Sequence, residues 1–431
     1  MSVALTRRSR RVISVLVLSA LAATLIAWGA TGPRSARIGL YSEAVVLGAD
    51  GTPTLVPEDG EPVLHAGTRV MDDPVSTADD TLAAEQRAWL ADGQIPGADG
   101  PYVDMVTDAL LDLRTLVRDD GAAVAAWSPY WRYVWPRDSS FVAVALAHSG
   151  HHADAVAILD FLAQVQEADG SFEARYLPDG TGDTPDDRGE QTDGTGWVLW
   201  AANEVVQTAA DPVATAEHLR PLVQRTAHHA ERLVIGDGLP EPSPDYWEVP
   251  ETQLTLGTVA PVLAGLENAA EFWTVLGETE RSASAQAAAD LSREAVESEF
   301  DDYGRYAGGD LADAASAFTL PPFQPVALDG ALKAWQDSAD RMARPAGGLA
   351  PGEGWRRDGI SWTPQTSLYA YTAASNGQDQ QATAWLDWLD AHRTDLGALP
   401  EKVLDDGSPA AVAPLAWTAA CVVLAVDALE G

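Results

Sequence analysis

The chain has 431 residues, of which 46% are hydrophobic, so it is long enough for one large domain or two average ones and can bury a substantial core. Its 64 acidic and 27 basic residues give a formal net charge of −37. A charge of this sign and size repels phosphate backbones and anionic lipid headgroups, which excludes nucleic acid as an expected partner.

The first thirty residues have the composition of an export signal. Several arginines between positions 7 and 11 precede an apolar stretch that runs from Val12 to about Ala30. This stretch is close to the lower limit for spanning a bilayer, and Trp28 spoils the small-residue cleavage pattern. We therefore expect residues 1–32 to be a signal peptide or a signal-anchor transmembrane helix. The rest of the chain is then exported, and is either anchored to the cell membrane facing outside or secreted.

Residues 33–78 are rich in Gly, Pro, Asp and Val and contain short alternating runs such as EAVVL and TPTLV. This composition predicts a linker with a few short strands.

From residue 79 onward, amphipathic segments alternate with loops rich in Gly, Pro and Asp, which predicts one helical domain over residues 79–431. The expected helices cover residues 80–92, 106–117, 152–166, 138–150, 194–209, 217–235, 254–276, 279–298, 325–343, 364–376, 378–393 and 412–429. Paired helices of this number predict an all-α fold, an (α/α)6 barrel made of a double ring, with an open solenoid as the alternative. No repeat of about 34 or 40 residues favours the solenoid. The only cysteine, Cys421, lies in an apolar run and predicts a buried thiol.

Four loops that precede expected helices each place a carboxylate beside aromatic residues or a proline. They are WSPYWRYVWPRDSS with Arg137 and Asp138, RGEQTDGTGWVLW with Asp193, SPDYWEVPETQ with Asp245, Glu248 and Glu251, and GALPEKV with Glu401. Helix capping explains each loop equally well when it is taken alone. In a double ring, however, the loops that enter the inner helices meet at one end. Two carboxylates across such a pocket are what cleavage of a glycosidic bond requires, and tryptophan faces suit sugar rings.

The same four segments resemble glycoside hydrolase family 15, which contains glucoamylases, glucodextranases and some bacterial trehalases. YVWPRDSS is similar to the family's aromatic-x-W-x-R-D signature, and QTDGTGWVLW to a family loop after the second helical pair. DYWE followed by LTLGTVA resembles the general-acid segment, in which the acid follows Trp. LPEKV followed by PLAWTAA resembles the general-base segment. The matches occur in the family's order and span about residues 100 to 430.

The resemblance implies an exo-acting, inverting glycoside hydrolase that releases a terminal sugar, β-D-glucose, from an α-glucan or α-glucoside. It implicates Glu248, rather than Glu251, as general acid and Glu401 as general base. The residues that it implicates in substrate binding are Arg137, Asp138, Trp135, Tyr133, Asp193, Trp247 and Trp355.

Acid–base chemistry on a glycoside needs no cofactor, and we expect none. We also expect no metal. Asp179, Asp183 and Glu190 fall at three positions of a calcium-type loop, but the glycine that such a loop needs is missing, which favours a solvated turn.

Two alternatives to a glucosidase remain. One is a hydrolase of the same fold for another glycoside, such as trehalose or a cell-wall glycan. The other is a catalytically inactive, membrane-anchored glycan-binding protein. The presence of both Glu248 and Glu401 argues against the inactive protein, because loss of either glutamate is the simplest route to inactivity.

Overall fold

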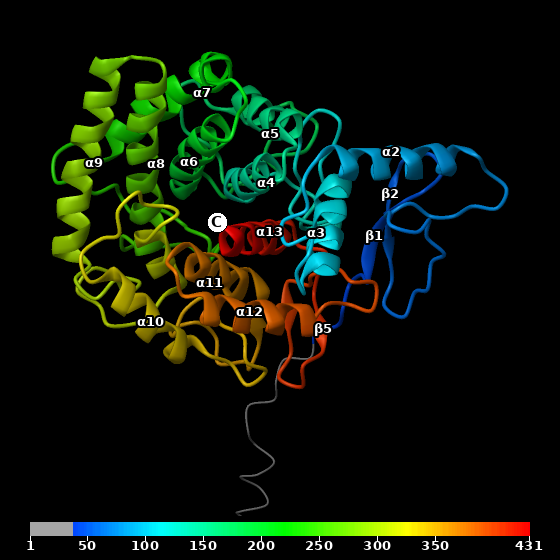
Figure 1. Ribbon diagram of the computed structural model, residues 1–431. Helices are drawn as coiled ribbons and strands as arrows, with labels where there is room; N and C mark the ends of the chain where they lie inside the picture. The colour runs from blue at the N-terminus through cyan, green and yellow to red at the C-terminus, as the bar shows by residue number, and fades with distance from the viewer. Residues whose placement is uncertain (1–37) are drawn as a thin grey trace, which may run out of the picture.

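A computed structural model describes residues 38–431, which fold into two concentric rings of helices (Figure 1). The inner ring consists of α4 (Pro136–His148), α6 (Asp193–Gln207), α8 (Leu256–Val275), the short 3₁₀ helix η1 (Ala314–Thr319), α11 (Thr363–Ser375) and α13 (Ala416–Glu430). Each of these elements contacts the next, and α13 returns to contact α4, so the ring is closed. The outer ring consists of α3 (Val103–Leu116), α5 (His152–Val165), α7 (Pro212–Leu233), α9 (Thr279–Glu299), α10 (Ala331–Met342) and α12 (Asp379–Ala391).

The two rings differ in how their helices are buried. Inner helices such as α8 are apolar on all sides and buried almost throughout, whereas outer helices such as α9 bury one stripe, which consists of Ala285, Ala289, Ser292 and Val296. Glycine allows the closest approach within the inner ring. A Cβ on Gly196 of α6 would lie 1.9 Å from the carbonyl oxygen of Pro261 in α8. Small residues therefore set the distance between α6 and α8.

The all-α prediction is confirmed, and closure of the ring rules out the open solenoid. Our set of twelve helices was wrong in two places. The helix predicted at 80–92 is α2 (Ala78–Asp92), which lies outside the double ring and contacts α3. The fourth inner position is filled by η1, which was not predicted because six residues, AASAFT, are too few to show a helical period.

The segment predicted to be a linker is packed against the barrel from residue 38 onward. It forms an antiparallel hairpin of β1 (Ala44–Leu47) and β2 (Pro53–Val56), in register Ala44 to Val56. Ala44 and Val45 are fully buried, and the buried Arg69 donates to Asp112 of α3 at 2.5 Å. A spacer would expose these groups, so this correction makes residues 38–77 part of the folded domain.

A second small sheet lies at the end of the barrel where the inner helices begin. Its strands are β3 (Ser361–Trp362), β4 (Lys402–Val403) and β5 (Pro409–Ala410), paired antiparallel in that order. This sheet holds the segment that follows Glu401.

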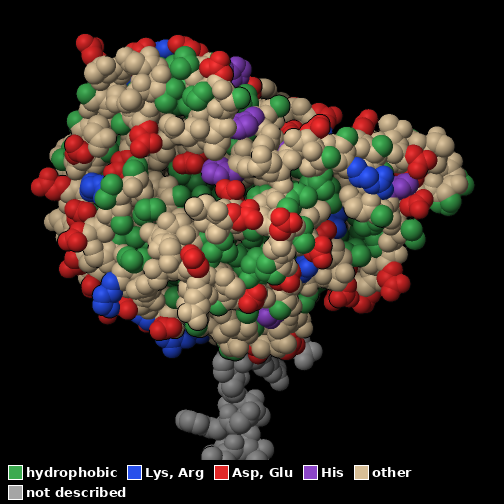
Figure 2. Space-filling view, in the orientation of Figure 1, with side chains coloured by type: hydrophobic (Ala, Val, Ile, Leu, Met, Phe, Trp, Pro, Cys, Tyr) green, Lys and Arg blue, Asp and Glu red, His purple; other side chains and the backbone are tan. Residues whose placement is uncertain are grey.

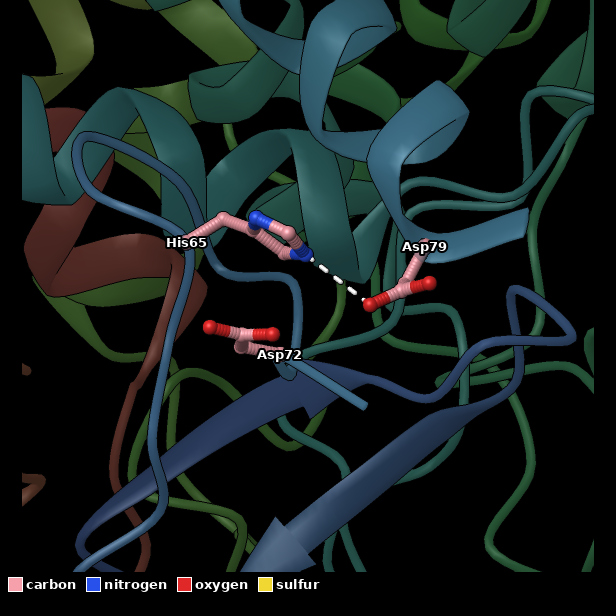
Figure 3. A group of neighbouring side chains, drawn as sticks. All are labelled: His65, Asp72 and Asp79. Carbon is pink, nitrogen blue, oxygen red and sulfur yellow. Dashed lines mark hydrogen bonds and ion pairs between the residues drawn. The ribbon is translucent and has the colours of Figure 1, made fainter. Parts of the chain in front are cut away.

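Figure 3 shows His65 of the N-terminal segment bound to Asp79 of α2, with Asp72 nearby. Nε2 of His65 lies 3.0 Å from Oδ2 of Asp79, and the same oxygen accepts the backbone N–H of Asp73 at 2.8 Å. The ligand atoms of the trio lie within 4.8 Å of one another, the one such group of metal-ligating side chains among residues 38–431. The two bonds to Asp79 give the group a structural role at the start of α2.

The expected signal or anchor segment, residues 1–32, lies outside the described residues. Within residues 38–431, none of the helices combines the length and the apolar character that a membrane span requires.

His148 connects three inner helices and makes stability depend on pH. It ends α4, its Nδ1 lies 2.8 Å from Asp427 of α13, and its Nε2 lies 3.3 Å from Glu204 of α6. Burial opposes the charge on the ring, but the hydrogen bonds to Asp427 and Glu204 outweigh burial and raise the pKa of His148 to about 9. A raised histidine pKa stabilises the fold below the unfolded value of about 6.5, and the stabilisation is lost as pH rises through 9.

We therefore expect wild type to exceed His148→Gln in free energy of unfolding by on the order of 3 kcal/mol at pH 6, and the difference to shrink towards pH 10. Urea denaturation of both proteins at pH 6, 8 and 10 measures this. A difference that does not change with pH would contradict the assignment.

Candidate active site

A pocket of ≈ 490 Å³ opens where the inner helices begin. Its walls come from the starts of α4, α11 and α13 and from the loop before α8. The side chains that line it are mostly aromatic or charged: Tyr130, Trp131, Trp135, Arg137, Asp138, Arg175, Arg188, Tyr246, Trp247, Glu248, Trp355, Arg356, Asp358, Trp362, Gln365, Glu401, Lys402 and Trp417. One cavity thus collects side chains from Ile38 to Trp417.

Seven of the nine predicted site residues line this pocket, namely Glu248, Glu401, Arg137, Asp138, Trp135, Trp247 and Trp355. The other two lie behind its wall. Tyr133 packs beneath the guanidinium of Arg175, 4.6 Å from the ring centre, and Asp193 is 1% exposed and binds Arg137. Tyr133 and Asp193 therefore support pocket residues, and their own contact with a ligand stays a prediction.

Arg137 is the centre of a buried charge cluster. Its Nη1 donates to Oδ2 of Asp193 at 3.1 Å, and its Nη2 lies 3.1 Å from Oε1 of Glu248 and 3.3 Å from Oδ2 of Asp138. The guanidinium also lies 5.2 Å from the ring centre of Trp417. One buried cation thus orients three carboxylates around the pocket floor.

Burial changes the titration of two of these carboxyl groups. It raises the pKa of Asp138 to about 6, against the opposing attraction of Arg137. It raises the pKa of Asp193 to about 7, again against Arg137. Desolvation therefore outweighs ion pairing at both positions, and perturbed carboxyl groups in a cleft are typical of functional sites.

Glu248 is held in an unusual backbone conformation. Its φ is +56°, in the left-handed region that non-glycine residues rarely adopt, and its N–H donates to the carbonyl of Asp245 at 2.8 Å. Asp245 fixes this turn by accepting from the N–H of Trp247 at 2.9 Å and from the hydroxyl of Thr255 at 2.7 Å. Strained residues of this kind cluster at active sites, and here the turn directs Glu248 to the pocket.

Glu251, the neighbouring glutamate, has a different environment. Its Oε1 binds Arg305 at 2.5 Å, its Oε2 accepts from the hydroxyl of Tyr306 at 3.1 Å, and it does not line the pocket. Arg305 also binds Asp245 and stacks on Trp247, 3.6 Å from the ring centre. Glu251 and Arg305 therefore clamp the loop that presents Glu248.

The backbone around Glu401 is fixed on both sides. Its N–H donates to the carbonyl of Val412 at 2.8 Å, and its carbonyl accepts from the N–H of Thr363 at 3.1 Å. The N-terminal segment braces Val412 in turn, because the N–H of Tyr41 donates to the carbonyl of Ala411 at 2.7 Å. The Glu401 side chain is 10% exposed, and its Oε2 lies 3.0 Å from Nζ of Lys402.

Sequence reasoning missed the basic residues of the pocket, which are Arg175, Arg188, Arg356 and Lys402. Lys402 was within reach, because it follows Glu401 directly and is one of two lysines in the chain. Arg175 and Arg188 lie in loops whose path depends on the fold, so no local pattern indicates them. Trp417 belongs to the quoted PLAWTAA segment but was not singled out.

Comparison with solved structures finds glycosidases of similar fold. A bacterial glucoamylase complexed with acarbose superposes with a TM-score of 0.67 at 17% identity, covering 83% of this chain and 59% of that one. A glucoamylase from Saccharomycopsis fibuligera gives a TM-score of 0.60 at 13% identity, covering 83% and 96%. A glycosidase structure in its wild-type form gives 0.65 at 20% identity, covering 76% and 96%. These likenesses show that the chain has a glucoamylase-like helical fold.

The similarity in sequence is more local. An uncharacterized glycosyl hydrolase of Methanocaldococcus jannaschii is 37% identical over 95 residues, a stretch that covers 22% of this chain and 15% of that protein. No protein-family model matches the chain.

Proposed function

We propose that the protein is an inverting, exo-acting glycoside hydrolase that removes a terminal sugar, β-D-glucose, from an α-glucan or α-glucoside. Glu248 is its general acid and Glu401 its general base. The glucoamylase-like fold, the local similarity to a glycosyl hydrolase and the two glutamates in one pocket support the assignment.

The observation that carries the proposal is the lining of one pocket, in which Glu248 and Glu401 lie among aromatic side chains. The tryptophans of this lining are Trp135, Trp247, Trp355, Trp362 and Trp417. Tryptophan rings pack on the apolar C–H faces of a sugar, and carboxylates and arginine bind its hydroxyl groups, so a carbohydrate suits this wall.

The chemistry follows from the two glutamates. One carboxyl group protonates the oxygen of the leaving group, while a carboxylate on the opposite side deprotonates a water molecule that attacks the anomeric carbon. The configuration at that carbon is then inverted. Arg137 and Asp138 supply charge-assisted hydrogen bonds to the hydroxyl groups of the sugar and hold it in one orientation.

The proposal also covers the cellular location. The arginine-rich start and the apolar run before residue 32 favour export, with the barrel outside the cell and either anchored or released.

The test is sugar release by the purified full chain from maltose, isomaltose, trehalose, dextran and soluble starch. We expect glucose from at least one α-linked substrate. If trehalose is the only substrate cleaved, the protein is a trehalase, and the hypothesis of an α-glucan substrate is wrong. Binding of these sugars without any release would favour the inactive glycan-binding protein.

A further inference from the structure

The resting state of Glu248 is unusual for a residue proposed to donate a proton. Its Oε1 lies 3.1 Å from Nη2 of Arg137, and its Oε2 lies 2.6 Å from Nη1 of Arg188. Guanidinium groups bind ionised carboxylates and have no acceptor for a carboxyl proton. Both oxygens of the Glu248 carboxyl group therefore have an arginine beside them, and one of the two arginines must move away before a leaving group can take its place at an oxygen.

Arg188 is the arginine that can move. The Arg137 side chain is 6% exposed and holds three carboxylates, whereas the Arg188 side chain is 39% exposed. Arg188 also has a second anchor, because its Nε lies 3.1 Å from Oδ2 of Asp186. Asp186 is itself held by Arg175 at 2.5 Å. Arg188 can therefore release Glu248 while it remains attached to Asp186.

A second cation lines the same pocket. Arg356 lines the cavity with an exposed side chain, and among residues 38–431 it has no ion pair or hydrogen bond. Its guanidinium lies 5.7 Å from the ring centre of Trp355, which contacts Trp247 at 4.9 Å, next to Glu248. Figure 2 shows that acidic side chains are scattered over the visible surface of a protein whose net charge is −37. Arg356 therefore offers an incoming anion a guanidinium that no carboxylate of residues 38–431 neutralises by an ion pair.

We propose that the substrate carries an anionic group, a carboxylate or a phosphate, on the leaving-group side of the bond that is cleaved. This group binds Arg188 and Arg356 and draws Arg188 away from Oε2 of Glu248, which frees that oxygen for proton transfer. Arg188 is thus a positioning and specificity residue. The inference rests on the proposed glycosidase function and narrows its substrate class.

The experiment uses the full chain and two matched pairs of compounds that differ in charge. One pair is α-glucosylglycerol and α-glucosylglycerate, and the other is trehalose and trehalose 6-phosphate. Wild type, Arg188→Gln and Arg356→Gln are compared for kcat and KM on all four compounds. Arg118→Gln is the matched control, since Arg118 is 46% exposed, lies outside this pocket and makes only a loose contact with Asp120 at 3.9 Å.

We expect wild type to prefer the anionic member of at least one pair by roughly 10- to 100-fold in kcat/KM, the size of a charge-assisted hydrogen bond. Arg188→Gln removes this preference. Its kcat/KM falls for the anionic compound, because the anion has lost a partner, and its kcat rises for the neutral compound, because Arg188 no longer holds Glu248. Arg356→Gln raises KM for the anionic compound alone, and Arg118→Gln behaves as wild type. A preference for α-glucosylglycerate over α-glucosylglycerol identifies the anionic group of the substrate as a carboxylate. A preference for trehalose 6-phosphate over trehalose identifies it as a phosphate.

The inference is overturned if wild type cleaves the neutral member of each pair at least as well as the anionic one, or if Arg188→Gln slows both members equally. If none of the four compounds is cleaved, the proposed function fails for these compounds, and calorimetric binding to Glu401→Gln decides the inference separately. The inference is supported if Glu401→Gln binds an anionic member more tightly than its neutral partner, and if adding Arg188→Gln abolishes this difference. Equal or absent binding of both members overturns it.

Discussion

Glu248→Gln and Glu401→Gln each lower kcat on the best α-glucoside by about 10²- to 10⁴-fold, the usual contribution of a general acid or base. Both substitutions keep the size of the side chain and remove only the ionisable group. Sugar release under saturating substrate measures the effect. Glu299→Gln, at the exposed end of α9, is the matched control and keeps wild-type turnover.

A substrate with a good leaving group separates the two roles. α-Glucosyl fluoride needs little protonation of its leaving group, so we expect it to restore much of the activity of Glu248→Gln and little of that of Glu401→Gln. If α-glucosyl fluoride instead restores the activity of Glu401→Gln, then Glu401 is the general acid and Glu248 the general base. Wild-type turnover in either variant on a natural glycoside would remove that glutamate from the mechanism.

Arg137→Ala has the largest expected effect on stability. It leaves Asp138, Asp193 and Glu248 without the guanidinium that all three contact, two of them buried. Removing one partner of a buried ion pair typically costs about 3–5 kcal/mol, and we expect a loss in that range together with loss of turnover.

The loss of stability in Arg137→Ala is expected to grow as pH rises. Burial already raises the pKa of Asp138 to about 6 and of Asp193 to about 7, so both carboxyl groups are largely protonated at pH 5 and ionised at pH 8. A neutral carboxyl group needs no cation, so Arg137→Ala destabilises more at pH 8 than at pH 5. Chemical denaturation at the two pH values measures this, with Arg118→Ala as control. An equal loss at both pH values would show that Arg137 acts through packing alone.

The parts of the fold that local sequence patterns predicted are those that depend on periodicity and on helix ends. Amphipathic outer helices such as α9 and apolar inner helices such as α8 are evident from the spacing of their residues. The 3₁₀ helix η1 was missed because its place in the ring depends on the elements around it and not on its own six residues. The position of α2 outside the ring depends in the same way on tertiary contacts.

The predictions for the pocket also divide into residues that local motifs identify and contacts that depend on the fold. Short motifs around Glu248 and Glu401 identified residues that do meet in one cavity. Sequence alone did not separate Glu248 from Glu251, since only the resemblance favoured the former. The structure gives a physical reason, because Glu248 lines the pocket and Glu251 does not. Long-range ion pairs such as Arg188 with Glu248 join loops 60 residues apart, and no local pattern contains them.

The most direct test of the account is the anomeric configuration of the sugar first released from maltose, or from the best α-linked substrate, followed by ¹H NMR. Because one carboxylate activates a water molecule opposite the leaving group, we expect β-glucose as the first product, before mutarotation. Initial release of α-glucose would contradict the inverting mechanism and the role assigned to Glu401.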